Sequence, residues 1–96
     1  LGTHHITGPE EYFEKFHSDL GLPPYVLGEA RDLWNTVKDD LSWQGKKPSG
    51  IAGVVLYRAS QNSTSPRTQN EVCKVSGISE VTLRGLLKIL NRMIAE

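Results

Sequence analysis

The residues best suited to chemistry lie near the C-terminus, in the segment SGISEVTLRGLLKILNR at 76–92. Four of them recur at offsets of three, four and four, which places them along one face of a helix: Val81, Arg84, Lys88 and Arg92. An arginine can donate two hydrogen bonds to guanine, and an exposed valine can contact a thymine methyl group, so this face could read bases in the major groove of DNA. On spacing alone, a helical hairpin with a solvated basic face explains the pattern equally well.

Two helices joined by a tight turn would position these side chains. The letters TQNE at 68–71 form a capping box that opens a short helix, and Gly77 supplies a sharp turn. Ser79 then caps a second helix, 80–95. This order predicts a helix-turn-helix over 68–95, whose second helix meets base edges with its first residues.

Three more helices are expected before this pair. They run from the Thr7-Gly8-Pro9-Glu10 capping signal to about Leu20, from Pro24 to Leu41 and from Ser49 to Gln61, with polar loops at 43–47 and 62–66. The apolar faces expected in the core are Tyr12, Phe13, Phe16 and Leu20 in the first helix, Val26, Ala30, Leu33, Trp34, Val37 and Leu41 in the second, and Leu83, Leu86, Leu87, Leu90 and Ile94 in the last, together with Ile78 in the turn before it.

The segment from Ser49 to Gln61 is apolar almost all round, which predicts a helix buried at the centre. Its glycines would let neighbouring helices approach closely. A β-strand over 51–57 is the rival interpretation by propensity, but Ala52 and Gly53 weaken a strand. We therefore expect an all-α fold of five helices.

The length of 96 residues allows one hydrophobic core, so a single domain over 1–96 is expected, with residues 1–8 flexible. The formal net charge is zero, but the charges are unevenly placed. Residues 1–44 hold eight acidic and three basic side chains, whereas residues 45–96 hold eight basic and three acidic ones. The C-terminal half could therefore face a polyanion, although a solvated charge dipole without function is as common.

Several classes of function find little support. Cys73 is a lone cysteine and the three histidines, His4, His5 and His17, lack metal-ligand spacing, so we expect no disulfide, metal or cofactor. The acidic pairs Glu10-Glu11 and Asp39-Asp40 have no nucleophile or glycine-rich phosphate loop nearby, so no enzyme is expected. No apolar run approaches the length of about 18 residues that spans a bilayer, and no signal peptide is evident, so an intracellular domain without a membrane partner is expected.

Several ordered blocks of the chain resemble the transcription factor IIB family, including the archaeal factor B proteins. These blocks are YFEKFHSDLGLP at 12–23, GKKPSGIAGVVLYRAS at 45–60, RTQNEV at 67–72 and SGISEVTLR at 76–84. They stand in the order of the family's second cyclin repeat, and the resemblance as a whole extends over nearly the entire chain. The resemblance implies a five-helix cyclin-like repeat with a C-terminal helix-turn-helix.

The resemblance also implies a function and a set of site residues. The family contacts DNA beside the TATA element while TATA-binding protein holds the bent promoter, and the full-length factor engages RNA polymerase. By position, Val81 and Arg84 match the readers of the B recognition element. The residues expected on the DNA backbone are Lys46, Lys47, Arg67, Thr68, Gln69, Ser79, Thr82 and Lys88. Such a factor would work in the cytoplasm of an archaeon or in the nucleus of a eukaryote.

Alternatives remain open at this stage. The cysteine and the VSGIS spelling also resemble the first repeat, whereas EVTLR favours the second. The family's full chain carries a zinc ribbon and two repeats, so we expect this chain to be an excised domain or a reduced relative. The rival function is a cyclin-like protein-interaction domain without sequence-specific DNA binding.

Overall fold

The computed structural model describes residues 9–61, 63 and 66–95, and these residues form five α-helices and one 3-10 helix. The elements are α1 Pro9–Leu20, α2 Pro24–Val37, η1 Leu41–Trp43, α3 Pro48–Ser60, α4 Gln69–Ser76 and α5 Glu80–Ala95. No strand occurs in the described ranges, and residues 51–57 are helical. The expectation of an all-α fold with five helices is therefore confirmed. The cap at Thr7 and the flexibility expected for residues 1–8 lie outside the described residues.

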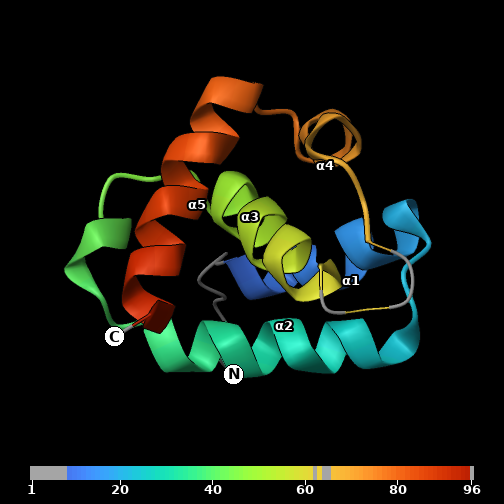
Figure 1. The fold of residues 1–96 in the computed structure, drawn as a ribbon, viewed down its shortest axis with the longest axis horizontal. Helices are drawn as coiled ribbons and strands as arrows, with labels where there is room; N and C mark the ends of the chain where they lie inside the picture. The colour runs from blue at the N-terminus through green and yellow to red at the C-terminus, as the bar shows by residue number, and fades with distance from the viewer. Residues whose placement is uncertain (1–8, 62, 64–65, 96) are drawn as a thin grey trace, which may run out of the picture.

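Helix α3 lies at the centre and packs against each of the other four α-helices (Figure 1). All but the first two and two later residues of this helix are buried, as its apolar sequence predicts. Two glycines allow the close packing. A Cβ atom added at Gly53 would lie 3.0 Å from the Cβ of Ser76 in α4, and one added at Gly50 would lie 3.1 Å from a methyl of Leu86 in α5.

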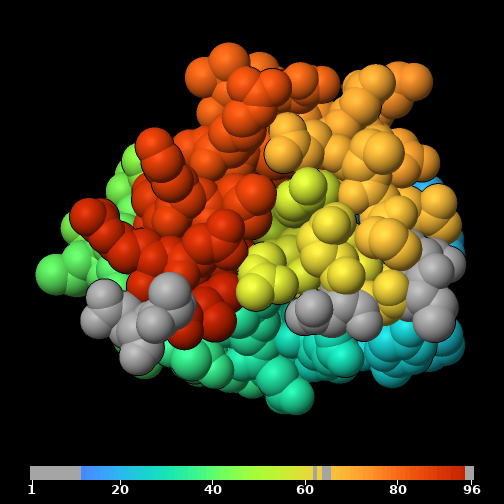
Figure 2. All heavy atoms as spheres, in the orientation of Figure 1, coloured from blue at the N-terminus to red at the C-terminus, as the bar shows by residue number. Residues whose placement is uncertain are grey.

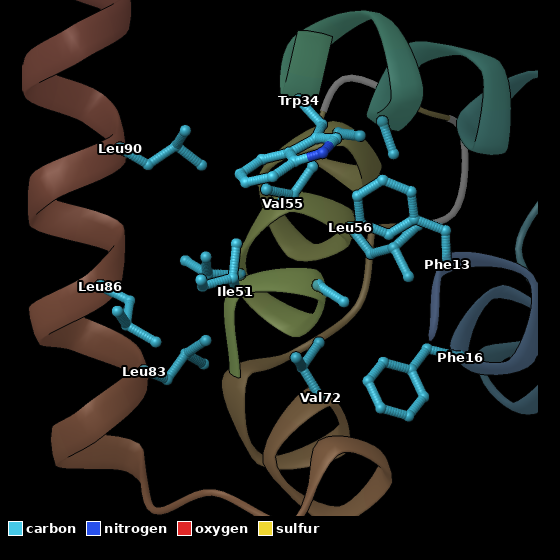
Figure 3. Close-up of a cluster of buried hydrophobic side chains, with 14 of the residues drawn as sticks. Phe13, Phe16, Trp34, Ile51, Val55, Leu56, Val72, Leu83, Leu86 and Leu90 are labelled. Carbon is cyan, nitrogen blue, oxygen red and sulfur yellow. The ribbon is translucent and has the colours of Figure 1, made fainter. Parts of the chain in front are cut away.

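The core draws apolar side chains from every α-helix (Figure 3). Phe13 and Phe16 approach α3 from α1, while Leu83 and Leu90 approach it from α5. Val72 brings α4 into the same cluster. The helix-turn-helix is therefore fixed to the central helix by burial of apolar area from both of its helices.

The predicted end of the second helix is wrong. Helix α2 ends at Val37 rather than Leu41, and the side chain of Leu41 is 75% exposed instead of buried. The reason is a new cap: the Asp40 carboxylate accepts a hydrogen bond of 2.8 Å from the backbone N–H of Ser42 and starts η1. The same hydrogen bond lowers the pKa of Asp40 below its ordinary value.

Trp43 was assigned to a polar loop, and it is instead part of the core. Its ring centroid lies 6.0 Å from that of Trp34, and its indole Nε1–H donates a 2.8 Å hydrogen bond to the Val37 carbonyl oxygen. The same carbonyl oxygen also accepts a 3.1 Å hydrogen bond from the Asp40 backbone N–H, so the buried indole N–H of Trp43 finds its acceptor at the C-terminal end of α2.

The prediction that Ile94 lies in the core is also wrong, because this residue is 37% exposed. It belongs to the last turn of α5, which extends to the rim of the bundle between α2 and α3 (Figure 1). The α5 side chains that pack partly against the core are Leu87, Ile89 and Met93, and of these Leu87 lines the same surface hollow as Ile94.

Candidate nucleic-acid interface

Helices α4 and α5 form the expected helix-turn-helix, and Gly77 makes the turn between them. Its φ of +77° lies in the left-handed region that glycine adopts without strain. Its backbone N–H donates a 2.8 Å hydrogen bond to the carbonyl oxygen of Cys73, which closes the end of α4. Figure 2 shows α4 and the first turns of α5 side by side at the top of the molecule. They form one continuous surface there.

Both helices begin with side-chain caps. The Thr68 hydroxyl accepts a 3.2 Å hydrogen bond from the Glu71 backbone N–H, and the Glu71 carboxylate accepts a 3.0 Å bond from the Thr68 backbone N–H. That second bond is the main cause of the lowered pKa of Glu71. In α5, the Ser79 hydroxyl accepts a 3.2 Å bond from the Thr82 backbone N–H and donates one of 3.0 Å to the Thr82 hydroxyl. Thr68, Ser79 and Thr82 therefore stabilise the two helix starts.

The outer face of α5 carries the residues that the spacing placed there. Val81 is 75% exposed, and Arg84, Lys88 and Arg92 are exposed further along the helix. An isolated valine at this exposure gains nothing from the core. Its position fits contact with another apolar group, such as a thymine methyl.

The Arg84 side chain joins α5 to α4. Its Nε–H donates to the side-chain oxygen of Gln69 at 3.3 Å, and its Nη2 donates to the Glu80 carboxylate at 3.3 Å. All three side chains lie on the surface of the helix-turn-helix. The contact with Glu80 is a missed element of the site, although the spacing of four between an acid and a base on one helix could have revealed it.

The basic loop lies beside the turn. Lys46 and Lys47 line a surface depression of about 340 Å³ together with Ser79 and Thr82 at the start of α5. Both lysines are exposed. The fold therefore brings two segments that are about thirty residues apart into one hollow, with two ammonium groups and a helix N-terminus around it. Each of these features attracts an anion.

Arg67 is placed differently from the other basic candidates. Its side chain folds toward the turn between α1 and α2, where Nη2 donates to the Gly21 carbonyl oxygen at 3.4 Å. Nη1 lies 3.8 Å from the Glu71 carboxylate, and Nε is buried without a partner among the described residues. Arg67 thus ties the start of α4 to the N-terminal helices, away from the depression lined by Lys46 and Lys47.

The described part of the chain offers little support for a metal site, a membrane-spanning helix or a reactive cysteine. No cluster of three metal-ligating side chains occurs there. No helix described is both long and apolar enough to cross a membrane. Cys73 lies beneath the helix-turn-helix, where burial raises the pKa of its thiol, the Glu80 carboxylate raises it further and the Arg84 guanidinium opposes the change. A neutral thiol is a poor nucleophile.

Comparison with known proteins gives one consistent result. The sequence profile of the transcription factor TFIIB repeat matches residues 3–93. Transcription initiation factor IIB 3 of Halobacterium salinarum is 40% identical over 78 residues, which cover 81% of this chain and 25% of that protein. Transcription initiation factor IIB of Methanocaldococcus jannaschii is 37% identical over 84 residues, covering 88% of this chain and 12% of that protein. The chain spans a quarter or less of the length of these relatives.

Proposed function

Because the chain belongs to the transcription factor IIB family, we propose that it is a promoter DNA-binding module that reads the B recognition element while TATA-binding protein holds the neighbouring TATA box. It would act as the second repeat of a general initiation factor, with no chemistry of its own. RNA polymerase would be engaged through the full-length factor. The observation that carries the proposal is the convergence of the basic loop and the start of α5 on one surface.

In this proposal the first turns of α5 enter the major groove. Val81 is 75% exposed and would contact a thymine methyl group, while Arg84 would donate two hydrogen bonds to guanine. Lys88 lies one turn beyond Arg84 on the same helix and would meet the DNA backbone as the groove curves away.

The phosphates beside the groove would meet the depression next to the turn. Lys46 and Lys47 would supply charge, and the Thr82 hydroxyl, which also lines this hollow, would donate to a phosphate oxygen. Ser79 would do so only by exchanging its hydrogen bond to the Thr82 hydroxyl for one to the phosphate. The contacts of Thr68 and Gln69 with DNA would be secondary to their contacts within the protein. Arg67 would act mainly by fixing α4, because its guanidinium lies against Gly21 and Glu71.

The experiment is a binding titration of the 96-residue chain on labelled promoter DNA, with and without TATA-binding protein, on an intact and a scrambled recognition element. Arg84→Ala should cost about 1–3 kcal/mol on the intact element and much less on the scrambled one. Lys46→Ala and Lys47→Ala should weaken binding to both sequences alike and lower the salt-dependence slope by about one unit each.

Lys38→Ala is the matched control, because Lys38 is an exposed lysine at the end of α2, on the side of the molecule away from the start of α5 (Figure 1). It should leave both the affinity and the slope unchanged. A chain that ignores DNA at low salt even with TATA-binding protein present would favour the other function, a cyclin-like protein-interaction domain.

A further inference from the structure

We propose that Glu80 and Gln69 are positioning residues that hold the Arg84 guanidinium ready for guanine, and that they thereby set the sequence preference of this surface. The inference rests on the proposed function. It concerns two residues whose side chains need not contact a base themselves.

The contacts of Arg84 occupy one edge of its guanidinium group. Gln69 accepts from Nε at 3.3 Å and Glu80 accepts from Nη2 at 3.3 Å, and Nε and Nη2 lie on the same side of the planar group. A guanidinium has five N–H donors, of which these two contacts use two. No acceptor among the described residues engages Nη1. The outer edge, formed by Nη1 and the second hydrogen of Nη2, therefore keeps two donors, as a bidentate contact with guanine O6 and N7 requires.

We call the two acceptors of Arg84, Gln69 and Glu80, its frame. The frame also affects which DNA sequences gain affinity from Arg84. A free arginine side chain is long and flexible and reaches any nearby phosphate, which adds affinity without preference. An arginine whose guanidinium is held along one edge by two acceptors loses less conformational entropy when it meets a correctly placed guanine. It also reaches fewer phosphates. Because Gln69 belongs to α4 and Glu80 to α5, the frame spans the helix-turn-helix.

Glu80 has two ordinary roles that must be separated from this one. Its negative charge lies in the first turn of α5, where it interacts favourably with the helix dipole, and it forms a surface ion pair with Arg84. The side chains of that pair are 61% and 47% exposed, for arginine and glutamate respectively. Both roles depend on the charge and affect stability. Positioning depends on an acceptor atom and affects preference.

A matched pair of variants separates charge from positioning. Glu80→Gln and Glu80→Ala remove the same charge, so they change the helix dipole and the repulsion of phosphate equally. Only glutamine keeps an acceptor within reach of Nη2. We expect Glu80→Ala to lower the preference for the intact over the scrambled element about 1.5- to fivefold relative to Glu80→Gln, which corresponds to the range of about 0.2–1 kcal/mol typical of exposed side-chain pairs. Gln69→Ala should lower it similarly, and Gln69→Glu should restore it.

Two further measurements decide the mechanism. In the Arg84→Ala background, Glu80→Ala should leave the preference unchanged, because the guanidinium group that Glu80 positions is then absent. In the free protein, the Nε–Hε NMR signal of Arg84 should differ from that of a solvated arginine in the wild type and in Glu80→Gln, and should move toward the solvated value in Glu80→Ala and Gln69→Ala.

Equal preference in Glu80→Ala and Glu80→Gln would overturn the inference and leave the proposed function intact, provided that Arg84→Ala still loses preference. A drop in preference on Glu80→Ala that persists without Arg84 would also overturn it, because Glu80 would then be contacting a base directly, as a carboxylate can do at cytosine N4. Absence of DNA binding in every variant and in the wild type would remove the proposed function and this inference together.

Discussion

Replacing Gly53 by alanine tests whether the central helix sets the position of the helix-turn-helix. A Cβ atom at this position would lie 3.0 Å from Ser76 Cβ, 3.1 Å from Ser76 Oγ and 3.4 Å from a Val72 methyl, all in α4. Ser76 cannot turn away easily, because it is buried and its hydroxyl donates a 2.7 Å hydrogen bond to the Val72 carbonyl oxygen. The added methyl group must therefore push α4 outward by a few tenths of an ångström.

The size of the effect follows from a matched comparison. Alanine is about 1 kcal/mol better than glycine inside a helix, and this gain applies equally to Gly53→Ala in α3 and Gly28→Ala in α2. A Cβ at Gly28 meets nothing within 4 Å, so Gly28→Ala should stabilise the fold by about 0.5–1 kcal/mol. Overpacking costs about 1–3 kcal/mol, so Gly53→Ala should be less stable than Gly28→Ala by about that amount.

Urea unfolding followed by circular dichroism measures this difference, and the fluorescence of the two tryptophans, Trp34 and Trp43, gives an independent signal because both are buried. Gly50→Ala should lie between the two variants, since the nearest atom there is the 3.1 Å distant end of the flexible Leu86 side chain. Equal stabilisation by Gly53→Ala and Gly28→Ala would refute the packing argument.

Four further substitutions test the core and the cap of α4. Trp43→Ala should cost about 3–5 kcal/mol of unfolding free energy because it empties a buried site, whereas Leu41→Ala, at a residue 75% exposed, should change it by no more than about 0.5 kcal/mol in the same urea titration. Val54→Asp should prevent folding, seen as loss of helical circular dichroism, because an unpaired buried charge costs several kcal/mol against a total of about 5–15. Since the folded-state pKa of Glu71 is lowered by the Thr68 backbone N–H, its contribution to stability is present above the unfolded-state pKa and is lost as pH falls through the folded-state pKa; a pH series should show a shallower acid loss in Glu71→Gln than in the wild type.

The helix content and the central position of α3 could be predicted from local pattern, because both follow from apolar spacing and from turn residues. The end of α2 could not. A helix to Leu41 continues the apolar stripe, but the Asp40 cap and the burial of Trp43 compete with it, and the tertiary contact with Trp34 decides the outcome. Trp34 and Trp43 lie in different elements, so the periodicity of a single helix or strand does not predict their contact.

In the candidate site, too, features set by neighbouring residues could be predicted from the sequence, whereas long-range contacts could not. The exposed face of α5 followed from its spacing, and the caps followed from Thr68 and Ser79. The direction of the Arg67 side chain did not, because Gly21, its carbonyl partner, is 46 residues away. The resemblance to the transcription factor IIB family marked Arg67 as a phosphate contact, while its side chain contacts Gly21 and Glu71 within the protein.

The position of α4 connects the core to Arg84, the residue that we propose reads a base. Gln69 lies at the start of α4 and reaches Arg84 at 3.3 Å, close to the longest distance at which such a bond retains useful strength. A shift of α4 by a few tenths of an ångström in Gly53→Ala would weaken this contact although Gly53 is buried far from any DNA. We therefore expect Gly53→Ala, at a temperature where it is fully folded, to lose preference for the intact element as Gln69→Ala does. It should keep the wild-type salt-dependence slope, because Lys46 and Lys47 are unaffected. Gly28→Ala should keep both. If Gly53→Ala retained full preference despite the expected loss of stability, α4 would not control Arg84, and the stability of the fold and the selectivity of its surface would be independent.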